Sequence, residues 1–388
     1  MNIRYHRPIL PDNLKNIFQD SVKDGWLTSG PRVKEFEQEL SRFLNIKYVV
    51  AVNSCTAALH LAMAAKNFKR GDKFLVPTYT FVATAEVGEY LGMEPIFIDC
   101  ENDGFNLDLN QVEEILKREK NIKAILPVHF AGMQVDMKSI FELSKDYNLF
   151  VLEDCAHSLE NKIDHAKHIT ESKNHSLAYS FYANKNITTG GEGGAFATDD
   201  EELSNRVKKL SLHGMSKDGW KRFETPTKWN YDVTELGFKY NMTDVSASFG
   251  IWQLKRIRIW HKRRLNIVKQ YNDGLKTVTG IVCPSIEENI QHSWHLYIIK
   301  MKPELWRISR NDLIKKINDQ GIGTSVHYKP IHMHYYYKNK YGYSDSDYPR
   351  AEKLSQNVIS LPLYPALEDN NIDYIIDIIN KIWDDFKY

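Results

Sequence analysis

Short apolar runs alternate with amphipathic segments from residue 36 to about residue 200. Runs of this kind are typical of buried strands, and a helix-length segment between successive runs favours parallel βαβ units over hairpins. The seven predicted strands are YVVAV from Tyr48, FLVP from Phe74, PIFID from Pro95, AILPVHF from Ala124, LFVLED from Leu149, AYSFY from Ala178 and GAFAT from Gly194. Together they predict an α/β fold with a large, mostly parallel sheet.

The segments between these strands carry apolar residues at helical spacing, so we expect helices that cover the faces of the sheet. They are CTAALHLAMAAK from Cys55, TFVATAEVGEYL from Thr80, LNQVEEILKREK from Leu109 and MKSIFELSKDY from Met137.

The pattern changes after about residue 242. A long helical stretch, DVSASFGIWQLKRIRIWHKRRLNIVKQYNDGL, precedes a mixed segment that ends in the helix-like IDYIIDIINKIWDDF. We therefore expect a large domain over residues 1–250, which includes the N-terminal segment. Residues 251–388 are expected to form a linking helix and a smaller C-terminal α/β domain. A chain of 388 residues with 42% hydrophobic residues is long enough to bury both cores.

Charge and composition exclude several function classes. The formal net charge is +1, so no general field recruits nucleic acid or anionic lipid, and a phosphate contact must be local. The first residues, MNIRYHRPIL, lack the apolar core of a signal peptide, and no run of about 18 apolar residues follows. The four cysteines are far apart without a CxxC spacing, which indicates neither disulfides nor a metal site. These features predict a cytoplasmic protein without membrane or nucleic-acid partners.

The most informative segment is SFYANKNITTGGEGG, in which Lys185 lies between a strand and a glycine-rich turn. Burial lowers the pKa of a lysine and exposes a neutral amine, which is what Schiff-base chemistry requires. Taken alone, this lysine is more often an ordinary surface residue. The turn also lacks the GxGxxG pattern of a dinucleotide site.

A second segment, VLEDCAHSLE, places Asp154 at the end of an apolar strand. The carboxyl ends of parallel strands are where α/β folds bind ligands, and a buried carboxylate there can keep a pyridine nitrogen protonated. The alternative is that Asp154 only caps the turn that follows.

Two further segments fit the binding of a flat, phosphorylated cofactor. In VNSCTAALHLA a helix begins near Thr56, and free N–H groups at such a start can hold a phosphate, although capping by Ser54 or Thr56 explains the same residues. In VPTYTFVATA, Tyr79 and Phe81 follow a strand, so one ring could stack on a cofactor, although most such aromatics are core residues. The histidine-rich HYKPIHMHYYY matches no common zinc spacing, so no metal is assigned.

In this order along the chain, these motifs resemble the DegT/DnrJ/StrS family of sugar aminotransferases, which have the aspartate-aminotransferase-like fold, fold type I of the pyridoxal-phosphate (PLP) enzymes. The resemblance covers nearly the whole chain and includes GWLTSGPRVKEFEQEL, PVHFAGMQVDM, LHGMSKDGW, ELGFKYNMTDVSASFG, SVHYKPIH and SLPLYP. It implies an aminotransferase that uses pyridoxal 5'-phosphate and passes through the pyridoxamine 5'-phosphate (PMP) form during turnover.

The resemblance implies roles for individual residues. Lys185 corresponds to the catalytic Schiff-base lysine, which also carries the proton in both half-reactions. Asp154 corresponds to the partner of the pyridine nitrogen, His157 to the residue beside the cofactor's ring oxygen, and Phe81 to the stacking ring.

The implied phosphate ligands come from three places in the sequence. They are Thr56 with the backbone of Ala57, Ser180, and Asn241 of the neighbouring subunit. The last contact implies a homodimer with composite active sites.

Three departures from the family pattern bear on this site. Cys55 stands where the family usually has glycine, and the turn TTGGEGG is one glycine longer than the common TTGEGG. Residues 160–176 lack the glycines usual between the aspartate and lysine strands, which suggests a remodelled surface near the substrate.

The implied substrates are a keto-sugar nucleotide and an amino-acid donor, with glutamate expected. The LHGMSKDGW stretch is similar to enzymes that aminate C4 of a 4-keto-6-deoxy or 4-keto-pentose nucleotide, which favours C4, and C3 remains an alternative. Candidate substrate contacts are His213, Lys217, Trp220, Arg222, His327, Tyr328 and His332. Each of these residues taken singly is more often surface or core than ligand.

Three other functions compete with amino transfer. A sugar 3-dehydratase of the same fold carries histidine in place of the lysine, so Lys185 argues against it. A PLP-binding regulator would need an appended nucleic-acid-binding module, which the near-neutral charge and the short N-terminal segment do not favour. A Rossmann oxidoreductase would need the glycine fingerprint after the first strand, and the sequence lacks it.

Overall fold

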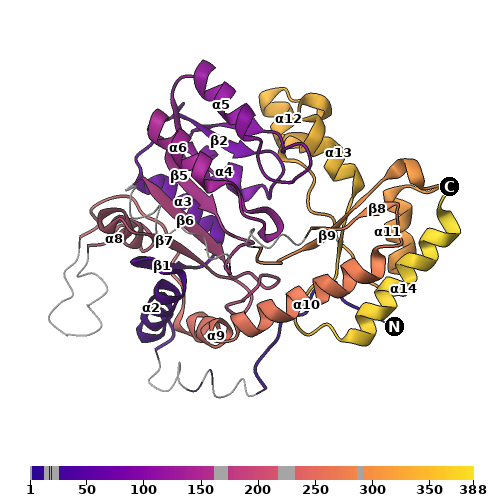
Figure 1. The fold of residues 1–388 in the computed structure, drawn as a ribbon. Helices are drawn as coiled ribbons and strands as arrows, with labels where there is room; N and C mark the ends of the chain where they lie inside the picture. The colour runs from indigo at the N-terminus through magenta and orange to yellow at the C-terminus, as the bar shows by residue number, and fades with distance from the viewer. Residues whose placement is uncertain are drawn as a thin grey trace.

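A seven-stranded sheet forms the centre of the larger body of the protein (Figure 1). The computed structural model describes residues 2–12, 17, 19, 26–160, 174–216, 232–285 and 292–388. The strand order is β1-β7-β6-β5-β4-β2-β3. The strands are β1 (Tyr48–Val52), β2 (Lys73–Pro77), β3 (Glu94–Ile98), β4 (Ile122–Ile125), β5 (Phe150–Asp154), β6 (His175–Ser180) and β7 (Gly194–Thr198).

All seven predicted strands are confirmed, with shifts of a few residues at their ends. From β3 to β6 the neighbours pair in parallel, whereas β7 runs antiparallel to both β6 and β1. The prediction of a mostly parallel sheet is therefore correct.

Alternate residues of the strands face two different cores. In β1, Val50 and Val52 point to a core shared with α3 (Cys55–Ala65) and α8 (Glu201–Leu210). Val49 and Ala51 point to a core shared with α2 (Pro31–Leu44) and α9 (Asp244–Leu254). Every second side chain of a strand faces the same side, so the sheet is buried on both faces. The helices of this body are α2 (Pro31–Leu44), α3 (Cys55–Ala65), α4 (Ala83–Glu89), α5 (Leu109–Arg118), α6 (Met137–Tyr147), α8 (Glu201–Leu210) and α9 (Asp244–Leu254).

The burial of each helix follows its pattern of apolar residues. Helix α3 is apolar on all sides and is almost wholly buried, because it lies between the sheet and neighbouring helices. Helices α5 and α6 are amphipathic and bury one stripe each against the edge of the sheet that contains β2 to β5.

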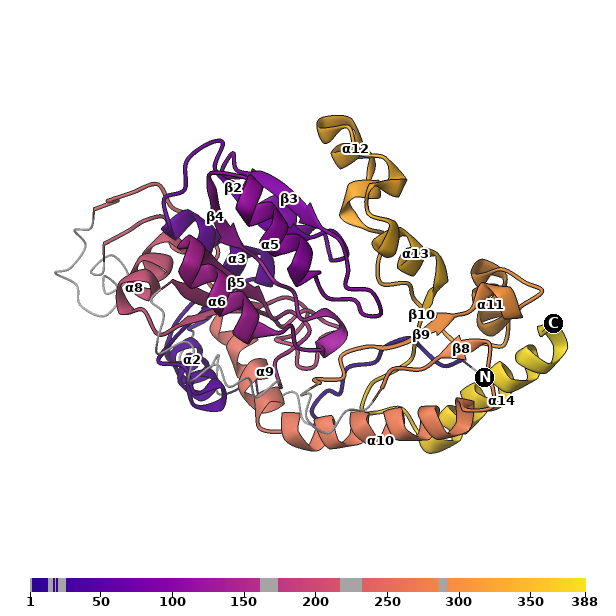
Figure 2. The same ribbon diagram turned by 45° about the horizontal axis from the view of Figure 1, so that its top comes forward.

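A smaller body follows, built on an antiparallel sheet with the order β10-β9-β8 (Figure 2). Its strands are β8 (Ile281–Val282), β9 (Tyr297–Met301) and β10 (Val358–Leu361). Its helices are α10 (Ile257–Leu275), α11 (Arg310–Asp319), α13 (Pro349–Asn357) and α14 (Asp369–Phe386). Helix α12 (Tyr335–Tyr341) packs instead on the larger body, where Tyr337 lies against Phe97 and Tyr341 bonds Glu89.

The link between the two bodies differs in detail from the expectation. The long helical stretch is two helices, α9 and α10, because helical hydrogen bonding stops near Lys255 and Arg256. The N-terminal segment, expected with the large domain, begins in the smaller body, where Ile3 pairs with Ile322 and is buried in its core. Among the described residues, no helix is both long and apolar enough to cross a membrane.

Candidate active site

The ends of β5 and β6 bring the predicted site residues together. Asp154 ends β5 and pairs with Ala178, and Ser180 ends β6 two residues further on, just before the turn that carries Lys185. Gly194, the first residue of β7, pairs with Ser180. A Cβ atom on Gly194 would lie 2.4 Å from the carbonyl carbon of Ser54, so only glycine lets β7 lie against the start of α3.

Lys185 has the electrostatic environment that a reactive amine needs. Its side chain is half-buried, and loss of hydration lowers the pKa of its amine from 10.5 to about 8, although Asp154 and Cys55 act in the opposite direction. The lowered pKa makes the neutral, nucleophilic amine accessible near physiological pH.

Asp154 is 5% exposed and accepts several hydrogen bonds. The Thr84 hydroxyl donates to its Oδ2 at 2.8 Å, and the Ala156 N–H donates to its Oδ1 at 3.0 Å. The Cys55 thiol also points at Oδ1, at 3.9 Å. Burial raises the pKa of Asp154, while these donors and the nearby Lys185 favour its charged form. The structure therefore supports more than a capping role for this aspartate.

Thr84 is a site residue that the sequence interpretation missed. It lies in the first turn of α4, three residues after Phe81, and its hydroxyl also lies 3.2 Å from the Phe81 carbonyl oxygen.

His157 is buried, and its protonation follows from its contacts. The Ala131 N–H donates to Nδ1 at 3.2 Å, so the ring proton of the neutral imidazole is on Nε2, which lies 3.3 Å from the Tyr328 hydroxyl. Burial lowers the pKa of His157 well below its usual value, with Lys185 acting in the same direction. The ring of His295 lies against His157, with 4.3 Å between ring centroids.

Phe81 is unusual for a large aromatic residue because its side chain is 58% exposed. Its ring centroid is 6.1 Å from that of Tyr328. An uncovered ring beside Tyr328, which itself contacts His157, offers a face on which a flat cofactor can stack. By contrast Tyr79, the other aromatic residue of the same segment, is buried in the core and donates to the His327 carbonyl.

The start of α3 was predicted to hold a phosphate. Ser54 caps the helix, because its Oγ accepts from the Ala57 N–H at 3.1 Å. The Ala57 N–H is thus bonded within the chain, and its predicted contact with a phosphate stays a prediction. Within the described part of the chain, no acceptor is found for the N–H groups of Cys55 and Thr56. These are the two groups at this helix start that remain open to a phosphate.

Ser180 and Asn241 lie at the same end of the sheet. Ser180 is buried and accepts a long hydrogen bond from the Tyr182 N–H at 3.4 Å. Asn241 pairs through its backbone with Val52 of the same chain, next to the start of α3, and its side chain bonds Ser29 and Lys239. Its predicted contact with the phosphate of a neighbouring subunit stays a prediction.

The substrate candidates fall into two groups. Tyr328 contacts His157 and Phe81, and His327 precedes it, buried, with Nδ1 at 2.8 Å from the Ser360 hydroxyl. Burial lowers the pKa of His327 to about 4. These two residues lie beside the predicted cofactor residues.

The other candidates do not join this group. Both ring nitrogens of the fully buried His332 are engaged, Nδ1 with the Thr78 hydroxyl at 2.7 Å and Nε2 with the Asp345 carbonyl at 3.1 Å. Both ring nitrogens of His332 are thus used within the chain, and its predicted contact with a substrate stays a prediction. His213 is exposed on the loop after α8. Lys217, Trp220, Arg222 and most of the 160–176 segment lie outside the described residues.

A buried carboxylate adjoins Asp154 on β5. Glu153 accepts hydrogen bonds from Nε2 of His129, at 2.7 Å, and from Nε2 of His175. Among the described residues, His129, Glu153 and Cys155 form the one group with metal-ligand spacing. His129 and Glu153 are hydrogen-bonded directly to each other in the buried core, and this bond explains why these residues lie together.

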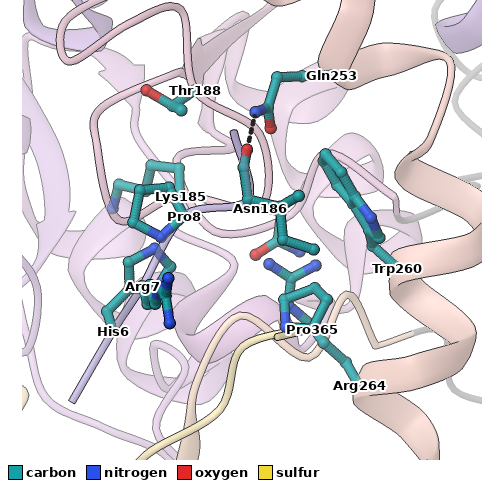
Figure 3. A pocket seen from close by; sticks show the side chains of 11 residues that line it. His6, Arg7, Pro8, Lys185, Asn186, Thr188, Gln253, Trp260, Arg264 and Pro365 are labelled. Atoms are coloured by element: carbon teal, nitrogen blue, oxygen red, sulfur yellow. Dashed lines mark hydrogen bonds between the residues drawn. The ribbon is translucent and has the colours of Figure 1, made fainter. Parts of the chain in front are cut away.

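A small pocket lies beside Lys185 (Figure 3). Residues of the N-terminal segment, the turn after Lys185, α9 and α10 line it. They are His6, Arg7, Pro8, Ile9, Lys185, Asn186, Thr188, Gln253, Trp260, Arg264 and Pro365.

The groups around Lys185 fit PLP. An amine of lowered pKa suits the aldehyde, a buried carboxylate suits the pyridine nitrogen, and an uncovered ring suits the flat heterocycle. Two N–H groups without acceptors at a helix start suit the phosphate. The four parts of the cofactor thus each have a chemical counterpart in the chain.

Comparison with known proteins finds relatives that match nearly the whole chain. Residues 9–380 match the DegT/DnrJ/EryC1/StrS aminotransferase family. Spore coat polysaccharide biosynthesis protein SpsC of Bacillus subtilis is 38% identical over 379 residues, which are 97% of this chain and 96% of that protein. The UDP-4-amino-4-deoxy-L-arabinose–oxoglutarate aminotransferase of Shewanella sediminis is 32% identical over 383 residues, 97% of each chain.

The fold and cofactor are shared with a solved relative. The putative sugar aminotransferase Spr1654 from Streptococcus pneumoniae, in its PMP form, is 31% identical, with a TM-score of 0.88 over 99% of this chain and 100% of its own. The same relative is also known in a PLP form. The chain described here therefore belongs to the DegT/DnrJ/EryC1/StrS aminotransferase family and is a PLP-dependent sugar aminotransferase.

Proposed function

We propose that the enzyme transfers an amino group from glutamate to a keto-sugar nucleotide, at C4 of a 4-keto-6-deoxy sugar. The observation that carries the amino-transfer chemistry is the Lys185 amine, of lowered pKa, next to the buried Asp154. The Shewanella relative, whose name specifies a 4-amino-4-deoxy sugar and oxoglutarate, supports the position and the donor. Amination at C3 is the alternative.

Lys185 and Asp154 divide the chemistry. Bound PLP supplies an electron sink for the carbanion formed when the donor loses its α-proton. Lys185 would hold the cofactor through its neutral amine, and the same amine would take the α-proton of the donor and deliver a proton to the acceptor carbon. Asp154, held by Thr84 and Ala156, keeps the ring nitrogen protonated. A lysine at this position also supports transfer over dehydration by an enzyme of the same fold.

His157, Tyr328 and Phe81 shape the open side of the site. Neutral His157 donates from Nε2 to the Tyr328 oxygen, which leaves the phenolic hydrogen available to a substrate oxygen. The exposed ring of Phe81 stacks on one face of the cofactor. We assign Tyr328, His327, His213 and Arg222 as candidate contacts to the sugar nucleotide.

The phosphate and the assembly form the last part of the proposal. Thr56 and its neighbouring N–H groups, together with Ser180, hold the phosphate from one subunit. Asn241 of the partner subunit completes the site, so the active form is a homodimer.

The test is a substrate panel. Purified enzyme is incubated with PLP, glutamate and a series of 4-keto and 3-keto sugar nucleotides, and the products are identified by mass and NMR. Amination at C4 supports the proposal, while amination only at C3 replaces it with the alternative. Failure to aminate any member, with Lys185→Ala as the background control, would contradict sugar-nucleotide amination.

A further inference from the structure

The residue after Lys185 is held by an unusually complete set of bonds. Asn186 is 6% exposed, and its Nδ2 donates to Oε2 of Glu160 at 2.6 Å and to the carbonyl of Ser293 at 2.8 Å. Its Oδ1 lies 3.0 Å from Nδ1 of His295. An amide has two donor hydrogens, so both are used here, and the orientation of the side chain is fixed. The backbone next to Lys185 is fixed with it.

The His295 end of this set reaches His157. Because the Asn186 oxygen can only accept, Nδ1 of His295 carries the proton, and burial lowers the pKa of His295 well below its usual value, so the ring is neutral. The ring lies against His157 at 4.3 Å. The backbone N–H of His295 also donates to the carbonyl of Ala131. The backbone N–H of Ala131 in turn donates to Nδ1 of His157.

The Glu160 end reaches helix α10. Nη1 of Arg264 lies 3.7 Å from Oε1 of Glu160, and both side chains are almost fully buried. Burial raises the pKa of Glu160 to about 7, while Arg264 and Asn186 act in the opposite direction. Figure 3 shows the Arg264 side chain extending from α10 toward Asn186 and Lys185. The turn that carries Lys185 is thereby tied both to α10 and to the segment before β9.

We propose that Glu160, Asn186, Ser293 and His295, here called the Asn186 bridge, form a positioning device that holds Lys185 in register with His157. The proposal rests on the proposed roles of Lys185 and His157. Members of the bridge act through these two residues and are positioning residues. Displacements of about 1 Å in such supports can cost on the order of 10²-fold in rate.

The first test measures the Lys185 amine in the protein without cofactor. Competitive labelling with a small acylating reagent, followed by mass spectrometry of the Lys185 peptide at a series of pH values, gives the amine pKa. In Asn186→Ala the turn loosens and water reaches the amine, so its pKa should rise from about 8 toward 10.5. Asn272→Ala is the matched control, because Asn272 makes two comparable bonds, to Pro284 and Tyr297, within the smaller body.

The second test separates the hydrogen bond from the ring contact. His295→Phe keeps a ring against His157 but removes the donor, whereas His295→Asn keeps an N–H donor for Asn186 without the ring. Only His295→Phe should shift the Lys185 pKa in the same direction as Asn186→Ala. The double variant Asn186→Ala with His295→Phe should shift it no further than Asn186→Ala alone, because both changes break one connection.

Kinetics then distinguish positioning from simple loss of stability. Asn186→Ala should lower kcat by roughly 10²-fold with little change in the KM for glutamate, while Asn272→Ala retains wild-type kcat. Equal Lys185 pKa values in wild type, Asn186→Ala and His295→Phe would overturn the bridge. Should Asn186→Ala fail to fold, the two His295 variants decide the matter.

A separate experiment distinguishes failure of the proposed role of Lys185 from failure of the Asn186 bridge. Borohydride reduction of the PLP-loaded enzyme fixes the cofactor to its lysine, which mass spectrometry identifies. PLP on another lysine would refute the proposed role of Lys185, and the bridge with it. PLP on Lys185 together with an unchanged pKa in the variants would refute the bridge alone.

Discussion

At the scale of residues, the site consists of groups whose ordinary pKa values are changed by burial. Lys185 loses hydration and becomes easier to deprotonate, Asp154 loses hydration but gains hydrogen-bond donors, and His157 stays neutral. Such opposed shifts within one small region are typical of active sites, because catalysis needs the less common protonation state of each group.

The lowered pKa of Lys185 predicts how PLP attachment depends on pH. A lysine amine loses its proton as pH rises, so the neutral fraction grows about tenfold per pH unit below about 8 and then levels off. The second-order rate of PLP attachment to cofactor-free protein, followed by absorbance, should show this profile. A rate that still rises tenfold per unit above pH 9 would show an ordinary lysine.

Asp154→Asn tests the ring-nitrogen partner. An asparagine fits the same space and can still accept from the Ala156 N–H, so the fold should persist, but a neutral amide cannot hold the nitrogen protonated. We expect turnover to fall by at least on the order of 10²-fold, while circular dichroism and the thermal midpoint change little. Turnover within a factor of two of wild type would exclude the proposed role.

At the scale of elements, the site depends on how closely β7 and α3 approach each other. Helix α3 begins at Cys55, next to β7, and its first N–H groups face the end of the sheet only because Gly194 has no side chain. The glycine-rich turn between β6 and β7 leads directly into this contact. Gly194 permits this close approach of two backbones, while Gly190 and Gly191, earlier in the turn, have positive φ values of 89° and 128°.

Gly194→Ala should separate these two elements. The added Cβ would lie 2.4 Å from the Ser54 carbonyl carbon, so the start of α3 must move, at a cost of about 1–3 kcal/mol in unfolding free energy. PLP affinity should fall with it, as measured by equilibrium dialysis. The comparison is Ser54→Ala, which removes the cap at about 1 kcal/mol without adding an atom to the contact. Unchanged PLP affinity in Gly194→Ala would show that this contact does not shape the phosphate site at the start of α3.

At the scale of the whole molecule, two bodies meet around Lys185. Helix α10, the segment before β9 and the N-terminal residues all line or support the pocket beside it. A site supported from both bodies needs their relative placement to be fixed.

The predicted homodimer can be tested directly. Sedimentation of the PLP-loaded enzyme should give a dimer or a larger even-numbered assembly, and Asn241→Ala should bind PLP more weakly because one phosphate ligand is lost. A fully active monomer would contradict the composite site. A PLP affinity unchanged in Asn241→Ala would contradict the specific contact.

The sequence by itself determined the seven strands, the main helices and the family, because strand and helix periodicities are local and the motifs around Lys185, Asp154 and Phe81 are contiguous. It also predicted which residues bear the chemistry. The residues that orient those groups could not be recognised from the sequence, because they are far from their partners along the chain. Thr84 lies 70 residues from Asp154, and Asn186 lies 109 residues from His295.

Only the tertiary structure decided which of these polar groups meet. The break between α9 and α10, the antiparallel direction of β7 and the crossing of Ile3 into the smaller body depend on packing between distant segments. The same holds for protonation: burial and hydrogen bonding make the Lys185 amine easier to deprotonate and keep His157 neutral, and both depend on neighbours that folding brings together.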